Sequence, residues 1–288
     1  MELLLFNVFN GFIIGMFYAL MALGLSLILG LNGIINFSHG GFLALGGYLA
    51  YSLTPAIGFW GALVLSPFLA GLLGLVVERG LIRPLYGRDP LYSLLLTFGL
   101  AMIMQDLIRT FWGATGLPFS VPSALNHPLS QVYFFITGYR VFLVVLALLA
   151  TAGLFALLRY TRVGVRIRAG NSDLETVSAL GINIYRLRAI NFGVGILLAG
   201  LAGVLAAGRL GLTPTMGTSL IMPSFVAIIV GGVGSLLGSM LGGIIIGIAA
   251  GVMTTYYPAA SDVIIYIIMA VVLIVRPRGL MGQEGLLE

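Results

Sequence analysis

Residues 4–29 read LLFNVFNGFIIGMFYALMALGLSLIL, a long apolar run without a single charged side chain. A helix needs about 20 such residues to cross the hydrocarbon core of a bilayer, which is about 30 Å thick. Further apolar runs of this kind follow along the 288-residue chain. The stretch therefore predicts a membrane protein built from helices, because a helix satisfies its own backbone hydrogen bonds in lipid.

Composition supports this prediction for the whole chain. Hydrophobic residues make up 60% of the sequence, charged residues only 8%, and the mean hydropathy is +1.13, values that exclude an ordinary soluble domain. We expect an all-α, polytopic transmembrane helical bundle that forms a single domain over residues 1–288, with about nine crossings and eight as the alternative. The expected crossings are residues 4–29, 34–52, 57–77, 91–111, 141–158, 189–207, 220–233, 236–253 and 263–275.

The basic residues predict the orientation in the membrane. All fourteen are arginine, and they concentrate in the loop after the third expected crossing, in the loop at about 160–188 and in the C-terminal tail. Basic loops are retained in the cytoplasm, so we expect a multi-pass protein of the cell (inner) membrane with a cytoplasmic C-terminus. The loop at about 113–138 then faces outside. Three crossings before the first basic loop would place the N-terminus outside, unless a broken segment near Asn32 changes the count.

The loop at about 160–188 contains a predicted short helix. Ser172 and Glu175 have the spacing of a capping box, which predicts a helix over residues 173–180 with Ser172 as the N-cap. Gly181 can end this helix, and Asn183 can cap the next one. Two turns are too few to be stable alone in water. The helix must therefore lie on the membrane surface or dock into another protein.

A polar cluster interrupts the apolar pattern early in the chain. Its members are Asn32, Asn36, Ser38, His39 and Gly40. Irregular backbone at membrane depth occurs only where it is buried in protein or lines a cavity, so the cluster is our candidate for a translocation pathway. The alternative is a short cytoplasmic turn. We predict no metal, cofactor or catalytic site here, because the only other histidine is distant and adjacent Ser38 and His39 seldom form a catalytic pair.

Glycine gives a separate indication about packing. The chain contains 41 glycines, many at four-residue spacing, and such faces allow helix backbones to approach closely. Gly11 with Gly15 forms one face, and residues 243, 247 and 251 form another. A further set predicts either helix packing or a hinge: Gly231, Gly232, Gly234, Gly238 and Gly242. Packing is the simpler interpretation.

Acidic residues are scarce, which bears on the mechanism. Asp106 falls within an expected crossing, and Arg109 shares its helix face, so we expect a local ion pair. A proton relay usually needs more than one such pair. The scarcity of acidic residues argues against the main alternative, an ion-coupled secondary transporter. An intramembrane enzyme is a further alternative, but the sequence offers no credible pair of nucleophile and base for it.

Five segments carry a family resemblance that runs nearly from end to end. They are ALMALGL (19–25), INFSHG (35–40), TRVGVRIRA (161–169) with ALGIN (179–183), GGVGS (231–235) with Gly238, and RPRGLMG (276–282). The set resembles the permease subunits of branched-chain amino acid ABC transporters of the high-affinity, binding-protein-dependent type, and among them the first of the two permeases. Related permeases for amides or urea look similar, so the resemblance says less about the substrate.

The resemblance implies a membrane-spanning subunit that forms half of a pathway and performs no covalent chemistry. It implies a heterodimer with a second permease subunit, two cytoplasmic ATPase subunits and an extracytoplasmic substrate-binding protein, all at a lipid bilayer and without nucleic acid. The chain contains no lysine, which a conventional P-loop ATPase needs, so ATP-derived energy must come from a partner. The expected ATPase-coupling residues are Arg166, Arg168, Ser172, Leu174, Glu175, Val177, Leu180 and Gly181.

Overall fold

The computed structural model describes residues 1–129 and 136–282, and these ranges are predominantly helical. The α-helices in the described ranges are α1 (Glu2–Asn32), α2 (Ser38–Val77), α3 (Pro90–Trp112), α4 (Gly138–Tyr160), α5 (Arg162–Ser172), α6 (Leu174–Ala179), α7 (Ile184–Leu210), α8 (Met216–Gly231), α9 (Leu236–Tyr256) and α10 (Ile264–Val275). Short turns of other helix types are η1 (Glu78–Ile82), η2 (Arg83–Leu85), η3 (Ser123–Leu125) and η4 (Pro258–Ala260). Part of the expected external loop, residues 130–135, lies outside the described residues.

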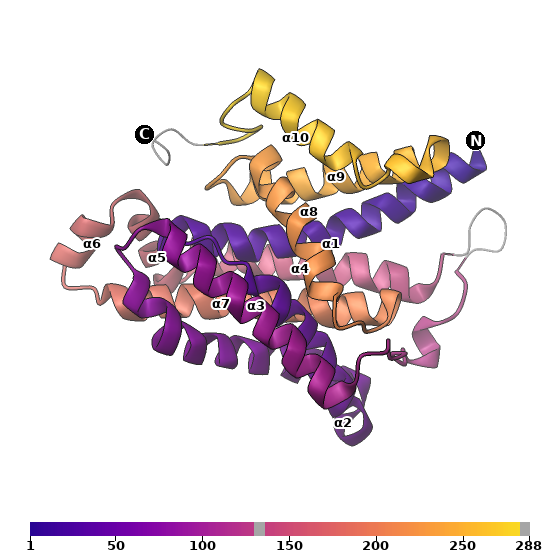
Figure 1. Cartoon of the computed structure of the whole chain (residues 1–288), viewed down its shortest axis with the longest axis horizontal. Helices are drawn as coiled ribbons and strands as arrows, with labels where there is room; N and C mark the ends of the chain where they lie inside the picture. Colours follow the sequence, from indigo (N-terminus) through magenta and orange to yellow (C-terminus); the bar gives the residue numbers. More distant parts are fainter. Residues whose placement is uncertain (130–135, 283–288) are drawn as a thin grey trace.

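The long helices run roughly side by side, so the molecule has two distinct ends. Figure 1 shows α5, α6 and the C-terminal segment at one end, with the N-terminus and the loop between α3 and α4 at the other. The loop between α2 and α3 also lies at the α5–α6 end (Figure 1). The three arginine-bearing segments of the sequence therefore gather at one end, which we call the basic end.

The expected number of crossings, eight or nine, is not confirmed by helix length and composition alone. Within the described ranges, six helices are long and apolar enough to span a membrane, and α8 and α10 are shorter apolar helices. The expected crossings at 34–52 and 57–77 are parts of one element, α2, in which Gly58 takes a non-helical conformation with φ 71°. Gly58 therefore separates two helical stretches within α2, and these stretches correspond to the two expected helices.

Helices α1 and α7 form the centre of the bundle. In each, 78% of the most apolar 18-residue window is buried inside the protein, against 17% for α3. Helix α2 packs along α7, and α9 packs along α1. The largest fully buried side chains come mainly from α1, with others from α2 and α7, among them Phe17, Tyr48 and Phe192. Helix α3 remains at the surface.

Glycine faces hold the central helices together. A Cβ added at Gly15 would lie 2.9 Å from the carbonyl oxygen of Gly243 and 2.9 Å from the Cα of Ile244, both on α9. Gly11 faces Gly247 and Gly251 in the same way. The four-residue spacing in the sequence thus corresponds to a backbone contact between α1 and α9, as small residues in membrane helices allow.

The α8–α9 turn is the second place where glycine is required. Gly232 and Gly234 have φ values of 108° and 84°, a region that side chains disfavour. Gly231 and Gly238 contact each other's backbone across this turn, and Gly242 lies against Ala227. The C-terminal segment closes the turn through hydrogen bonds from the backbone of residues 280 and 281 to the last carbonyls of α8, each 2.9 Å long.

We predict that Gly15→Ala destabilises the protein by about 1–3 kcal/mol, because the added methyl group meets backbone atoms that cannot rotate away. The measurement is the apparent Tm of the purified protein in detergent. A drop relative to the unchanged chain is expected.

Gly153 supplies the matched control for this substitution. It lies within α4, and a Cβ there meets nothing within 4 Å. Gly153→Ala should therefore leave Tm unchanged or raise it slightly, since alanine favours the helix by about 0.5–1 kcal/mol. Equal effects of the two substitutions would show that the α1–α9 contact does not depend on glycine.

Candidate functional site

A break in the helical backbone lies between α1 and α2. Helix α1 ends at Asn32 with Gly33 in the left-handed conformation, and α2 begins at Ser38. The backbone between them is held by Thr97 of α3, whose hydroxyl accepts from the Phe37 N–H at 3.2 Å and donates to the Ile35 carbonyl at 3.1 Å. Thr97 is about 10 Å along α3 from its first residue. The break is thus held against α3, with Ile34 and Asn36 buried and Gly33 exposed.

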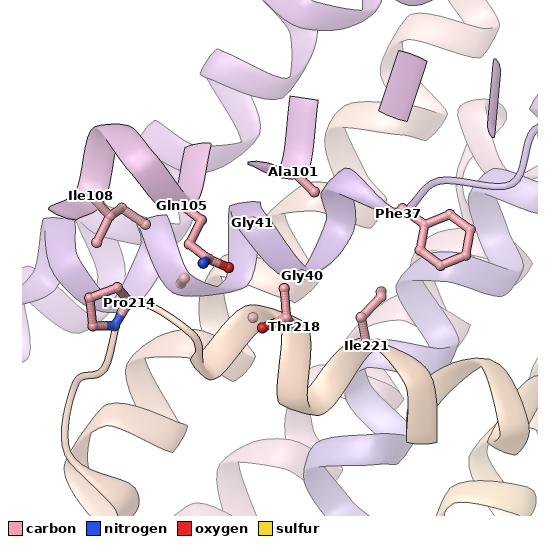
Figure 2. Close-up of a pocket in the computed structure, with 11 residues that line it drawn as sticks. Phe37, Gly40, Gly41, Ala101, Gln105, Ile108, Pro214, Thr218 and Ile221 are labelled. Carbon is pink, nitrogen blue, oxygen red and sulfur yellow. The ribbon is translucent and has the colours of Figure 1, made fainter. Parts of the chain in front are cut away.

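A narrow pocket lies beside this break. Figure 2 shows Gly40 and Gly41 of α2, Gln105 of α3 and Thr218 of α8 around it, with the Phe37 ring at one side. Its full lining is Phe37, Gly40, Gly41, Ala44, Ala101, Gln105, Ile108, Pro214, Gly217, Thr218 and Ile221. The space for the centre of a water molecule is about 10 Å³, which is room for about one water. The pocket is mainly apolar, with two polar side chains.

Glycine makes the pocket narrow. A Cβ at Gly40 would meet the carbonyl of Gly217, and one at Gly217 would meet the carbonyl of Gly40, so α2 and α8 touch through their backbones. Phe37 closes one side by packing against Phe225 of α8 and Phe98 of α3, with ring centroids 5.0 and 6.1 Å apart. Movement of α8 relative to α2 would therefore change the size of this pocket directly.

The five residues expected along a pathway have different locations. Gly40 lines the pocket, whereas Asn36, Ser38 and His39 are fully buried and are not part of its lining. The Ser38 hydroxyl donates to Asn36 Oδ1 at 2.6 Å, which stabilises the start of α2. His39 packs toward Gly24 of α1, where an added Cβ would lie 2.9 Å from its ring. Gln105 and Thr218 were not predicted from the sequence, because polar residues on two distant helices share no pattern along the chain.

Asn32, the fifth of these residues, belongs to a buried polar network at the basic end. Its Nδ2 donates to the Tyr86 hydroxyl at 2.6 Å, and that hydroxyl donates to Glu78 Oε1 at 2.9 Å. Asn191 of α7 donates to Asn32 Oδ1 at 2.8 Å and to the Leu27 carbonyl at 2.7 Å. The network joins the end of α1, the η1 turn after α2 and the start of α7.

Electrostatics strengthen this network. The Arg188 guanidinium lies over the Tyr86 ring, 4.4 Å from its centroid, and Glu78 is fully buried beside it. Burial, and after it the neighbouring Glu78, raises the pKa of Tyr86. Glu78 also begins η1, a π-helical turn, and such turns are frequent at functional sites.

The basic loop contains two helices where the sequence predicted one. Helix α5 is capped by Thr161, whose hydroxyl accepts from the Gly164 N–H at 3.0 Å, and it ends at Ser172. The prediction that Ser172 caps the next helix is wrong, because Asp173 does so by accepting from the Thr176 N–H at 3.0 Å. Hydrogen bonds from Thr176 also lower the pKa of Asp173. Asn183 caps α7, as expected, and Gly181 has φ 79°.

Helices α5 and α6 dock on the base of the bundle. Ile167 and Val177 are buried and pack in one cluster with Leu27, Leu31 and other apolar side chains of the long helices, and Leu174 is half-buried against it. The other coupling residues face outward: Arg166, Arg168, Ser172, Glu175, Leu180 and Gly181. Leu180, the C-cap residue directly after α6, is 74% exposed, which is an uncommon degree of exposure for leucine.

The expected ion pair within α3 is absent. Asp106 and Arg109 are both exposed and both described, yet no ion pair joins them. The prediction was wrong because it rested on helical spacing alone, and spacing does not fix the side-chain conformations that an ion pair needs.

The spanning helices and the buried helix break define a multi-pass membrane protein of the transporter type. A family model described as branched-chain amino acid transport system / permease component matches residues 7–273. The chain belongs to this family.

Curated relatives agree with this assignment over nearly the whole chain. The high-affinity branched-chain amino acid transport system permease protein LivH of Escherichia coli (strain K12) is 31% identical, over 96% of this chain and 95% of its own length. The corresponding protein BraD of Pseudomonas aeruginosa is 29% identical, over 95% and 94%. The E. coli permease protein LivM is 27% identical, over 76% of this chain and 57% of LivM.

We predict that Tyr86→Phe lowers the stability of the protein by about 1–3 kcal/mol, because it leaves Asn32 and the buried Glu78 without their shared partner. The measurement is the apparent Tm in detergent. Tyr256→Phe is the control, since Tyr256 is 71% exposed, and its effect should stay within about 0.5 kcal/mol. A Tyr86→Phe protein as stable as the control would contradict the role of the network.

Proposed function

We propose that this chain forms half of the translocation pathway of an ATP-driven importer for branched-chain or similar small apolar amino acids. The observation that carries the proposal is the buried break at residues 33–37 beside the pocket of Figure 2, in a chain of the permease family. A broken helix at membrane depth is a common element of substrate pathways. The pocket is far too small for an amino acid, so the pathway needs a second permease subunit and a movement of α8.

The basic end is proposed to face the cytoplasm. Arginine-bearing loops are retained on that side, and α5, α6 and the C-terminal segment share this end in Figure 1. The loop between α3 and α4 then faces an extracytoplasmic substrate-binding protein. In this orientation, the N-terminus lies outside and the C-terminus inside.

Two cytoplasmic ATPase subunits are proposed to supply the energy, one of them by contact with α5 and α6. A helix of six residues is stable only when held by its surroundings, and Val177 holds α6 to this protein through one face. Leu180, Glu175 and the two arginines remain available for a partner. We retain Arg166, Arg168, Ser172, Glu175, Leu180 and Gly181 as proposed contacts, and we assign Leu174 and Val177 to transmitting the movement.

The contacts of α5 and α6 with the long helices support the transmission of an α6 displacement into the membrane. Val177 and Ile167 pack on α1, α4 and α7 near the basic end. The network of Asn32, Tyr86 and Glu78 joins α1 and α7 to the connection between α2 and α3. A displaced α6 therefore moves several long helices together. Gly231, Gly232 and Gly234 are proposed as the hinge that lets α8 move relative to α2, with Gly238 and Gly242 as its packing surface on α9.

We expect the purified chain to hydrolyse no ATP, because it lacks the lysine that a P-loop requires. The complex of both permeases, both ATPases and the binding protein, in liposomes, should take up radiolabelled L-leucine only with ATP. ATP hydrolysis by the chain free of partners would refute the proposal. Uptake of urea or an amide in place of leucine would change the proposed substrate class to amides or urea.

We predict that Leu180→Asp weakens ATPase binding by about 30-fold, because a charge replaces an apolar side chain at the centre of the proposed contact, a loss of about 2 kcal/mol. Co-purification of the ATPases measures this. Leu129→Asp is the control, since Leu129 is 63% exposed in the loop at the opposite end. Normal co-purification with Leu180→Asp would place the ATPase contact elsewhere.

A further inference from the structure

Helix α3 carries charge in an unexpected position. It is an apolar helix of 23 residues with 17% of its most apolar window buried, and most of its large side chains face away from the bundle. Asp106 lies on this outward surface about 9 Å before the last residue, Trp112. If α3 is centred on a hydrocarbon core about 30 Å thick, its length of about 34 Å places this carboxylate inside the core.

Lipid is an unsuitable environment for this carboxylate. Within the described residues, Asp106 forms no ion pair and its carboxylate has no hydrogen-bond partner, and Arg109 one turn away does not neutralise it. An arginine can extend its long side chain to the interface, whereas an aspartate cannot. Ionisable residues inside membranes nearly always face the bundle interior or a water-filled cavity. The surface around Asp106 therefore requires water or a polar ligand.

This surface is continuous with the pocket beside the helix break. Gln105 lines that pocket from α3, as Figure 2 shows, and it also borders the hollow on the outward surface together with Met102, Asp106 and Arg109. The residue next to Asp106 thus reaches Gly41 and Thr218. A pathway that opens at the pocket would extend along α3 past the carboxylate.

We propose that the Gln105–Arg109 face of α3 lines the aqueous pathway shared with the second permease subunit, and that Asp106 accepts the ammonium group of the zwitterionic amino acid there. The inference rests on the proposed function and assigns it a substrate-contacting residue. A carboxylate forms strong charge-assisted hydrogen bonds with an ammonium group. Arg109, on the same helix face, offers the opposite charge to the substrate carboxylate.

Cysteine labelling tests whether the face is aqueous. The chain contains no cysteine, so Asp106→Cys introduces a single thiol. The assembled complex in nanodiscs is treated with a water-soluble trimethylammonium methanethiosulfonate, and the mass of this subunit reports the reaction. Val145→Cys is the matched control, since Val145 is 47% exposed on α4 at a similar distance from the same end of the bundle.

We expect Asp106→Cys to react at least about tenfold faster than Val145→Cys, because the reagent attacks the thiolate and an apolar environment raises a thiol pKa. Equally slow reaction at both positions would show that α3 faces lipid and would overturn the proposal. Co-purification of all subunits verifies that each variant assembles.

Uptake measurements test the contact with substrate. Asp106→Asn keeps the shape but removes the charge, and we expect the rate of ATP-driven L-leucine uptake to fall by about tenfold or more. Asp106→Glu keeps the charge and should retain more uptake than Asp106→Asn. Undiminished uptake by Asp106→Asn would overturn the ammonium contact. Failure of the unchanged complex to import would refute the proposed function instead, so the two failures are distinguishable.

Discussion

The structure depends on one constraint, the need to satisfy backbone hydrogen bonds away from water. Continuous helices meet it within themselves, but the break at residues 33–37 cannot. Thr97 of α3 supplies a donor and an acceptor to this break, and Asn36 and Ser38 stabilise the restart of the helix. The surrounding helices must therefore lie close to the break. That requirement brings α2, α3 and α8 together and creates the pocket between them.

Close approach of these helices in turn requires glycine, and the glycine contacts determine which helices can slide along each other. Helix backbones meet directly at Gly40 with Gly217 and at Gly15 with Gly243, so at these points no side chain separates the paired helices. Such surfaces fit tightly yet present few obstacles to sliding. At the basic end, by contrast, Tyr86 and the buried Glu78 fasten α1, α7 and the α2–α3 connection through directional hydrogen bonds. The bundle thus combines a fastened base with a glycine-lined contact near the pocket.

Several features of the fold and the site were predictable from local sequence. The apolar runs predicted an all-helical membrane protein, glycine spacing predicted faces for close helix packing, and Asn183 was recognised as a helix cap. Other predictions failed where neighbouring residues compete for one role. Ser172 and Asp173 are both good caps, and only the end of α5 decides between them. The pairing of Asp106 with Arg109 failed because spacing brings side chains near each other without making the contact favourable.

The sequence by itself determined the class of environment, the clustering of basic residues and the family, because composition, charge pattern and motifs are properties of the chain. The tertiary structure alone decided which residues meet. Gln105 and Thr218 lie on helices far apart in sequence but line the same pocket. Asn32 does not line this pocket and instead forms hydrogen bonds with Tyr86 and Asn191. The physical reason is that a hydrogen bond or a pocket depends on distances in space, which helix packing sets and periodicity along one helix does not encode.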